Sequence, residues 1–237
     1  MHSTVLITTA NEPPVNLPHL KMTNIAMRYL TAKASVFFWA AYGVEKIVIA
    51  DATGTSLLDQ EDLQRLSQIG VMVEQISYFQ DEDLIKAKGK GYGEGELIKF
   101  ALEKSTFLKN ENNFFKCTGK VYCRNFESVL DLIKENNIQH IFWRHLGDGD
   151  LLAPWVDLRF FYTTKKFCEE NLIPAYLNSD DSQAAAEYFC FNMLNEKLPA
   201  AKALRPLLSG FSGGTGEKYF DSSLGALDIN YPCWVGV

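Results

Sequence analysis

Continuous apolar runs, separated by segments of helical periodicity, organise the hydrophobic pattern of this chain. Val5–Thr9 is a short β-branched run that suits a buried strand, and Glu45–Asp51 is continuously apolar, as expected for a strand buried on both faces of a parallel sheet. Val71–Tyr78 (VMVEQISY) reads as a third strand. Strands that alternate with helices predict an α/β fold, with residues 1–110 as a βαβαβ nucleotide-binding half. The expected helices are Asn24–Gly43, Gln60–Ile69, about Glu94–Lys104, Ser128–Glu135, Lys165–Tyr176 and Gln183–Leu194.

The second half, residues 111–237, mixes short apolar runs with turn residues. Asn113–Cys123 reads as a strand pair or a bent strand with Gly119 near its middle, and Ile138–Arg144 as a further strand. Trp155–Phe161 is rich in aromatic residues, and Ser209–Tyr219 is rich in glycine and serine. Because no internal repeat or low-complexity linker interrupts the chain, we expect a single domain with a C-terminal extension that packs back on it.

Composition and charge narrow the classes of function. The chain has 237 residues, of which 47% are hydrophobic, a formal net charge of −6 and a pI near 5.3, so nucleic acid is not an expected partner. The start resembles no secretory signal, and no run approaches the roughly 18 apolar residues of a membrane span. Its five cysteines lack CxxC spacing, which favours reduced thiols and a cytoplasmic location.

The segment Lys86–Lys104, with sequence KAKGKGYGEGELIKFALEK, is the first candidate for ligand chemistry. It places glycines and lysines directly before a helix expected from about Glu94. Glycine lets a backbone approach a ligand closely, and a helix N-terminus offers free N–H groups to an anion such as phosphate. A flexible surface loop before a well-capped helix is the structural alternative.

The ends of the first two strands supply further candidates. In an open α/β sheet, ligands bind beyond the carboxyl ends of the strands. We therefore expect Thr8, Thr9 and Asn11 near a ligand, with Asp51 at a nucleotide ribose or base. An ordinary strand-to-helix loop, or a turn or cap role for Asp51, would explain the same residues without a ligand.

Several motifs together resemble one family. The pattern KGxGYGEGELIxxALxxS, followed by FFKCTGKVY, the segment Asp157–Phe161 (DLRFF), and Ser209–Gly210 with Ser212–Gly216, occur in this order between Val5 and Tyr219. They are similar to small bacterial glycosyltransferases of the GT-A type from surface-polysaccharide (lipopolysaccharide or capsule) gene clusters. That family prefers Arg where this chain has Lys120, and Thr where it has Leu158. The resemblance implies a GT-A-like, Rossmann-type mixed sheet flanked by helices.

The same resemblance implies a nucleotide-sugar donor and a polysaccharide or glycolipid acceptor. GT-A enzymes usually hold a divalent metal with a DxD motif after the fourth strand, where this chain has FFKCTGK. A lysine there would offset phosphate charge in place of the metal, so Mg²⁺ or Mn²⁺ is not favoured as a cofactor. The literal DxD, Asp148 and Asp150, is a weak metal candidate, with a solvated turn as the alternative.

Roles for individual residues follow from these expectations. Asp157, beside Arg159 in an aromatic segment, is the first candidate for the catalytic base, and Glu187 is the second; a structural Asp–Arg pair and a solvated helix face are the alternatives. Lys116 and Lys120 are expected opposite the wall that Lys86–Lys104 forms. The expected donor-binding residues are Thr9, Asn11, Arg28, Asp51, Lys88, Lys90, Gly91, Gly93, Glu94, Lys116 and Lys120, with Ser212, Gly213, Thr215 and Lys218 in a closing loop.

Two other classes of function remain open. A nucleotidyltransferase shares the α/β layout, but it would carry a glycine-rich loop directly after the first strand, where this chain has Asn11–Pro14 (NEPP). A non-catalytic nucleotide-sugar-binding protein would bind the donor without turnover. Peripheral contact with the cytoplasmic face of the inner membrane, or with other polysaccharide-assembly enzymes, is likewise left open.

Overall fold

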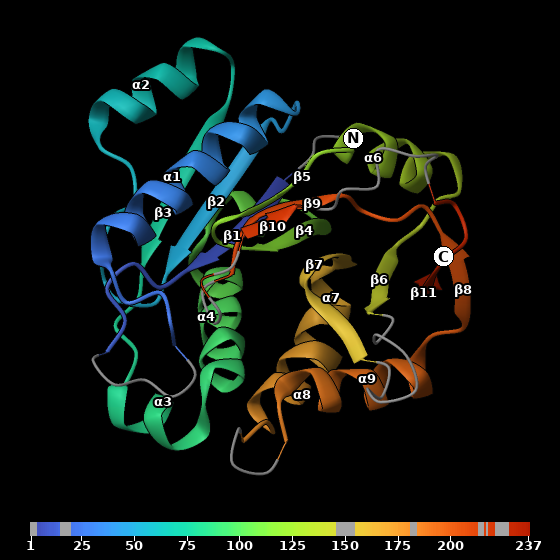
Figure 1. Cartoon of the computed structure of the whole chain (residues 1–237). Helices are drawn as coiled ribbons and strands as arrows, with labels where there is room; N and C mark the ends of the chain where they lie inside the picture. Colours follow the sequence, from blue (N-terminus) through green and yellow to red (C-terminus); the bar gives the residue numbers. More distant parts are fainter. Residues whose placement is uncertain are drawn as a thin grey trace.

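The computed structural model describes residues 4–14, 20–145, 155–180, 184–212, 216, 218–220 and 228–237. Within them a mixed sheet of eight strands forms the centre of the molecule (Figure 1). Its strand order is β3 (Met72–Ser77), β2 (Lys46–Asp51), β1 (Thr4–Thr9), β4 (Asn113–Thr118), β7 (Trp155–Thr164), β6 (His140–His145), β11 (Tyr231–Gly236) and β8 (Ala200–Ala203).

The first four strands in this order are parallel, and the remaining ladders are antiparallel. A second sheet of three antiparallel strands lies beside the main one: β5 (Val121–Cys123), β9 (Leu208–Phe211) and β10 (Lys218–Phe220). The fold class is therefore as expected, a mixed α/β sheet flanked by helices. The sheet takes strands from both halves of the chain, so residues 1–110 and 111–237 share one hydrogen-bonded framework.

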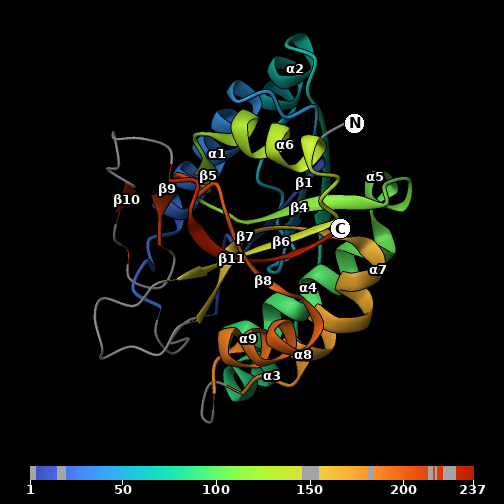
Figure 2. The ribbon, with the colours of Figure 1, turned by 90° about the vertical axis from the view of Figure 1, so that its right-hand side faces the viewer.

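Helices cover both faces of the main sheet (Figures 1 and 2). One hydrophobic cluster packs the sheet against α1 and α6, and the other packs it against α4, α8 and α9. Alternate side chains of the buried strands enter opposite clusters, as a two-sided core requires. The helices are α1 (Ile25–Ala41), α2 (Gln60–Gln68), α3 (Glu82–Lys88), α4 (Lys90–Lys104), α5 (Thr106–Lys109), α6 (Phe126–Glu135), α7 (Lys165–Phe167), the π-helical η1 (Cys168–Leu172), α8 (Ile173–Leu177) and α9 (Ala186–Lys197).

The glycine-rich segment Lys86–Lys104 differs from the prediction. It is helical except at Gly89, whose φ of 95° separates α3 from α4. Gly91 and Gly95 lie inside α4. A Cβ on Gly91 would stand 2.5 Å from the Ala186 side chain, and a Cβ on Gly95 would stand 2.4 Å from the Tyr176 side chain. The glycines therefore allow α4 to pack closely on its neighbours, and the expected loop before Glu94 is wrong because α4 begins at Lys90.

Other elements were predicted incompletely. Asn113–Cys123 is not a strand pair within one sheet, because β4 belongs to the main sheet and β5 to the small one. Trp155–Thr164 is a full strand, and the sequence analysis missed β8 and β11 altogether. Among the described residues, no helix has both the length and the apolarity needed to cross a bilayer.

Candidate functional site

A cavity of about 400 Å³ opens at the carboxyl ends of β1, β2 and β4. This is the edge of a parallel sheet where α/β proteins bind ligands, and its volume lies in the range of small-molecule sites. Ten sequence-predicted residues line it: Thr8, Thr9, Arg28, Lys90, Gly93, Glu94, Lys120, Arg159, Glu187 and Ser212.

The turn between β4 and β5 carries Lys120 in a left-handed backbone, with φ of 77°. The backbone N–H of the preceding Gly119 donates to the Thr8 carbonyl at 2.7 Å, and that of Phe211 donates to the Lys120 carbonyl at 2.9 Å. A Cβ on Gly210 would stand only 1.9 Å from the Lys120 carbonyl oxygen. Strands β1 and β9 thus clamp the turn, which stabilises a backbone conformation that a lysine rarely adopts.

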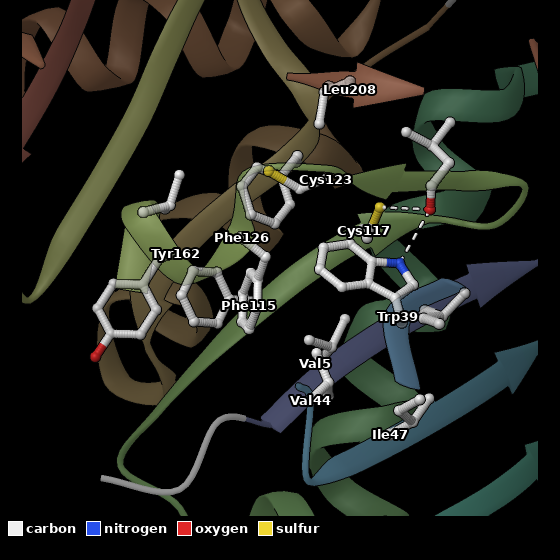
Figure 3. Close-up of a cluster of buried hydrophobic side chains, with 14 of the residues drawn as sticks. Val5, Trp39, Val44, Ile47, Phe115, Cys117, Cys123, Phe126, Tyr162 and Leu208 are labelled. Atoms are coloured by element: carbon white, nitrogen blue, oxygen red, sulfur yellow. Dashed lines mark hydrogen bonds between the residues drawn. The ribbon is translucent and has the colours of Figure 1, made fainter. Parts of the chain in front are cut away.

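The next residue anchors the same turn to the core. The Val121 carbonyl accepts hydrogen bonds from the Ser35 hydroxyl at 2.7 Å, the Trp39 indole at 3.0 Å and the Cys117 thiol at 3.2 Å. Figure 3 shows the Trp39 and Cys117 side chains directed at one carbonyl oxygen within the hydrophobic cluster. Side chains of helix α1 and strand β4 therefore fix the backbone directly after Lys120.

Lys120 is a buried cation on the cavity wall. Its residue surface is only 5% exposed, and within the described part of the chain no carboxylate lies at ion-pair distance from its ammonium. Burial, together with the nearby Arg28 charge, lowers the pKa of Lys120 from 10.5 to about 7, whereas Asp51 opposes the shift. A buried ammonium without a close counter-ion is costly unless an anion joins it.

Arg28 adds a second positive charge to this wall. It is 3% exposed, and its guanidinium donates to the carbonyls of Ala10 and Met22. Burial lowers the pKa of Arg28 from its ordinary value, and the charge of Asp51 opposes that effect. Helix α1 thus carries Arg28 under the loop that follows β1, facing the same cavity as Lys120.

Asp51 does not line the cavity, in contrast to the role expected for it. Its Oδ1 accepts from the backbone N–H and hydroxyl of Thr53 and of Thr55, at 2.6–3.1 Å. Its Oδ2 accepts from the Thr9 hydroxyl and the Asn11 N–H, both at 2.9 Å. With both oxygens engaged, Asp51 ties together the loops after β1 and β2 and positions them around the cavity.

Glu94 and Lys116 form a buried ion pair. Lys116 is fully buried, and its ammonium donates to Glu94 Oε1 at 2.6 Å, to the Thr118 hydroxyl at 2.9 Å and to the Leu158 carbonyl at 2.8 Å. These three acceptors use all three of its N–H groups. Lys116 is therefore placed beneath the cavity, where it holds Glu94, and it is not among the lining residues.

Asp157 is also engaged within the protein. Its carboxylate accepts two hydrogen bonds from the Arg159 guanidinium, at 2.8 and 2.6 Å, and a third from the Arg159 backbone at 3.0 Å. Asp157 is 7% exposed and does not line the cavity, whereas Arg159 does. This arrangement is the structural pair weighed in the sequence analysis, with Asp157 orienting Arg159.

The remaining predicted residues are dispersed. Asn11 is buried and donates to Thr55, and Lys88 pairs with Asp180 at 3.3 Å outside the cavity. Lys218 is exposed on β10. Gly91 lines a neighbouring cavity with Lys90, Glu94 and Glu187. Four predicted residues lie outside the described ranges: Asp148, Asp150, Gly213 and Thr215.

The donor set at the end of β4 does not fit a metal ion. Lys116 and Lys120 stand where carboxylates would be needed, and hard divalent cations require oxygen ligands. In the ranges that the structure describes, no three His, Cys, Asp or Glu side chains gather into a possible metal site.

Phe79 is a lining residue that the sequence analysis missed. It follows β3, is 80% exposed, and its ring lies over Gly54, where a Cβ would stand 2.2 Å from the ring. An exposed aromatic ring on a cavity rim suits stacking against a base or sugar. The rule that ligands meet the carboxyl ends of parallel strands, applied to the third strand as to the first two, would have found it.

The chain matches no protein-family model and no curated protein. Solved structures that resemble it include a putative nucleotide-diphospho-sugar transferase from Desulfovibrio desulfuricans G20, with 16% identity, a TM-score of 0.47, and coverage of 83% of this chain and 77% of that one. A putative glucose-1-phosphate thymidylyltransferase from Bacillus anthracis has 8% identity, a TM-score of 0.44 and 91% coverage of both chains. Core-mannan synthase A from Aspergillus fumigatus has 10% identity, a TM-score of 0.36, and coverage of 80% of this chain and 66% of that one. Because these TM-scores are below 0.5, we base the proposed function on the geometry of the site.

Proposed function

We propose that this protein is a glycosyltransferase that takes a sugar from a nucleotide-sugar donor and transfers it to a glycan or glycolipid acceptor. The observation that carries the proposal is the buried Lys120 ammonium on the cavity wall, beside Arg28 and without a carboxylate at ion-pair distance among the described residues. A diphosphate brings the negative charge that these two cations lack. In this proposal the cations stabilise the leaving nucleoside diphosphate, as a metal does in related chemistry.

The other walls of the cavity suit the rest of such a donor. Thr8, Thr9 and Thr53 at the ends of β1 and β2 donate their hydroxyl protons to Glu94 or Asp51, and their oxygens can still accept hydrogen bonds from a nucleoside. The exposed Phe79 ring offers it an aromatic face. Glu94, Arg159 and Glu187 supply charged groups that hydrogen-bond to sugar hydroxyls. Ser212, where the chain leaves β9, borders the same space.

A thermal-shift panel of nucleotides and nucleotide sugars tests the proposal, since a ligand stabilises the folded state according to its affinity. We expect at least one nucleoside diphosphate or its sugar conjugate to raise Tm equally with EDTA and with Mn²⁺. The variant Lys120→Met should lose most of this shift. The matched control is Lys99→Met, an exposed lysine on α4, which should retain it. Absence of any shift would overturn the proposal, and loss of the shift in EDTA would overturn its metal-independent form.

Product analysis separates transfer from the alternatives. A glycosyltransferase releases a nucleoside diphosphate from the nucleotide sugar, either by transfer or by slow hydrolysis. A nucleotidyltransferase instead forms a nucleoside triphosphate when pyrophosphate is added. A binding protein would give the thermal shift and neither product.

A further inference from the structure

A second cavity, of about 350 Å³, adjoins the first through a shared wall. Lys90, Glu94, Leu158 and Glu187 line both cavities, whereas Arg28, Lys120 and Phe79 line the first alone. The cationic wall and the aromatic rim therefore face one compartment. The second compartment is completed by Gly91, Tyr176, Ala185 and Ala186.

The lining of the second cavity favours a neutral ligand rich in hydroxyl groups. Two carboxylates and one ammonium offer acceptors and donors, and the small side chains of Ala185 and Ala186 leave room beside them. Tyr176 is fully buried in this wall, and its hydroxyl has no hydrogen-bond partner within the described residues. A cavity of this volume lies near the lower end of the range for small-molecule sites, which suits one sugar unit of an acceptor.

Glu94 stands at the junction with its carboxylate fixed on one side. Oε1 accepts from Lys116 at 2.6 Å, from Thr8 at 2.9 Å and from Thr118 at 3.4 Å. No hydrogen bond from the described residues engages Oε2, while the side chain retains 23% exposure. One oxygen thus holds the group in place, and the other is available to a ligand in either cavity.

We propose that the second cavity binds the acceptor sugar and that Glu94 Oε2 accepts the proton of its attacking hydroxyl. This inference rests on the proposed glycosyltransferase function. The acceptor oxygen forms a bond to the anomeric carbon of the donor sugar. The bond from that carbon to the phosphate oxygen breaks, and the nucleoside diphosphate leaves with the electron pair towards Lys120 and Arg28. The acceptor proton passes to Glu94, so charge and atoms balance.

Hydrolysis tests the inference without a known acceptor, because water replaces the acceptor hydroxyl. The substrate is the nucleotide sugar that gives the largest thermal shift, and the readout is release of nucleoside diphosphate. We expect Glu94→Gln to lower this release at least 100-fold, with donor affinity within about threefold of wild type. The matched control Glu103→Gln, an exposed carboxylate on the same helix, should change neither quantity.

Two further variants control for the fact that Glu94→Gln also leaves Lys116 without its counter-ion. Glu94→Asp keeps the charge but withdraws the carboxylate by one methylene, and should release product at least tenfold more slowly with unchanged Tm. The double variant Glu94→Gln with Lys116→Met removes both charges of the pair and should be as inactive as Glu94→Gln. Full activity in either variant would overturn the role of Glu94. A larger loss in Glu187→Gln than in Glu94→Gln would assign the proton to Glu187 instead.

Filling the second cavity tests its role separately. Ala185 is exposed at its wall, so Ala185→Trp should fold and should block approach from this side. We expect slower hydrolysis with unchanged donor affinity. Unchanged hydrolysis, or an equal loss of donor affinity, would show that the cavity does not deliver the attacking hydroxyl. A wild-type protein that binds no nucleotide sugar, or hydrolyses none, would contradict the proposed function and with it this inference, whereas wild-type hydrolysis that survives Glu94→Gln would contradict this inference alone.

Discussion

Lys120 carries one conformational cost and one electrostatic cost. Its backbone is left-handed, and the residue is only 5% exposed beside a second cation. Strain of this kind persists where the surrounding structure over-determines it, and it concentrates at functional sites. Here Gly119, Gly210 and Val121 enforce it. Binding of an anion would offset part of the electrostatic cost of the buried ammonium. Nucleotide affinity should therefore depend on the protonation of Lys120, and so on pH.

Nucleotide affinity should fall as pH rises through the pKa of Lys120. That pKa is about 7 in the folded protein, so the ammonium is largely protonated at pH 6.5 and largely neutral at pH 8.5. We expect the affinity for the nucleoside diphosphate found by thermal shift to fall about fivefold to tenfold over this range. Isothermal titration calorimetry measures it. Lys120→Met should bind more weakly and lose most of the slope, and an unchanged slope in that variant would contradict the assignment.

The stability of the protein without ligand should change with pH in the opposite direction to nucleotide affinity. The pKa of Lys120 is lowered in the folded state, so the unfolded chain binds the extra proton between about pH 7 and 10.5. Stability therefore rises with pH across this window, and the full cost is present below pH 7. Lys120→Met should raise the free energy of unfolding at pH 6.5 by at least about 1 kcal/mol. In urea titrations the gain should shrink at pH 9, and a gain independent of pH would contradict this reasoning.

At the scale of elements, the turn between β4 and β5 depends on a glycine far away in sequence. Gly210 has φ of 129°, and its missing Cβ makes room for the Lys120 carbonyl. We expect Gly210→Ala to lower stability by about 2 kcal/mol or more and to weaken nucleotide binding, because the contact is with backbone. The control Gly70→Ala also has positive φ, 82°, but open space around it. It should cost about 1 kcal/mol and leave binding unchanged.

Helix α4 shows why local patterns predicted the site only in part. Glycines before an amphipathic segment normally indicate a loop, yet Gly91 and Gly95 are helical because α8 and α9 pack against them. The reason is a contact with Ala186 and Tyr176, which lie far later in the sequence, and no local pattern contains it. The sequence did indicate that Glu94 and Lys116 belong to one site. It could not indicate that Lys116 would donate all three of its N–H groups to Glu94, Thr118 and Leu158.

At the scale of the molecule, the parallel half of the sheet was predictable, whereas in the antiparallel half only β6 was predicted as a strand. β1 and β2 are largely apolar runs, β3 is a predicted strand that Glu74 and Gln75 interrupt, and residues at or just after the ends of β1 and β2 line the cavity. β8 reads Ala200–Ala203 (AAKA), which has no β-branched or aromatic residue, and β11 contains Pro232, which disfavours a strand interior. β11 pairs with β8 on one side and with β6 on the other, and both pairings join residues far apart in the sequence.

Because this sheet joins strands from both halves of the chain, we expect the protein to unfold as one cooperative unit. β11 contributes Trp234, which is fully buried against α9, with its indole donating to Asn195 at 3.0 Å. We expect Trp234→Ala to cost about 3–5 kcal/mol, while Ile229→Ala, exposed in the same segment, should be nearly neutral. Circular dichroism and tryptophan fluorescence should report one coincident transition in wild type and variant. A variant in which the second half melts first, leaving nucleotide-dependent stabilisation of the first half, would instead divide the chain into two domains near residue 110.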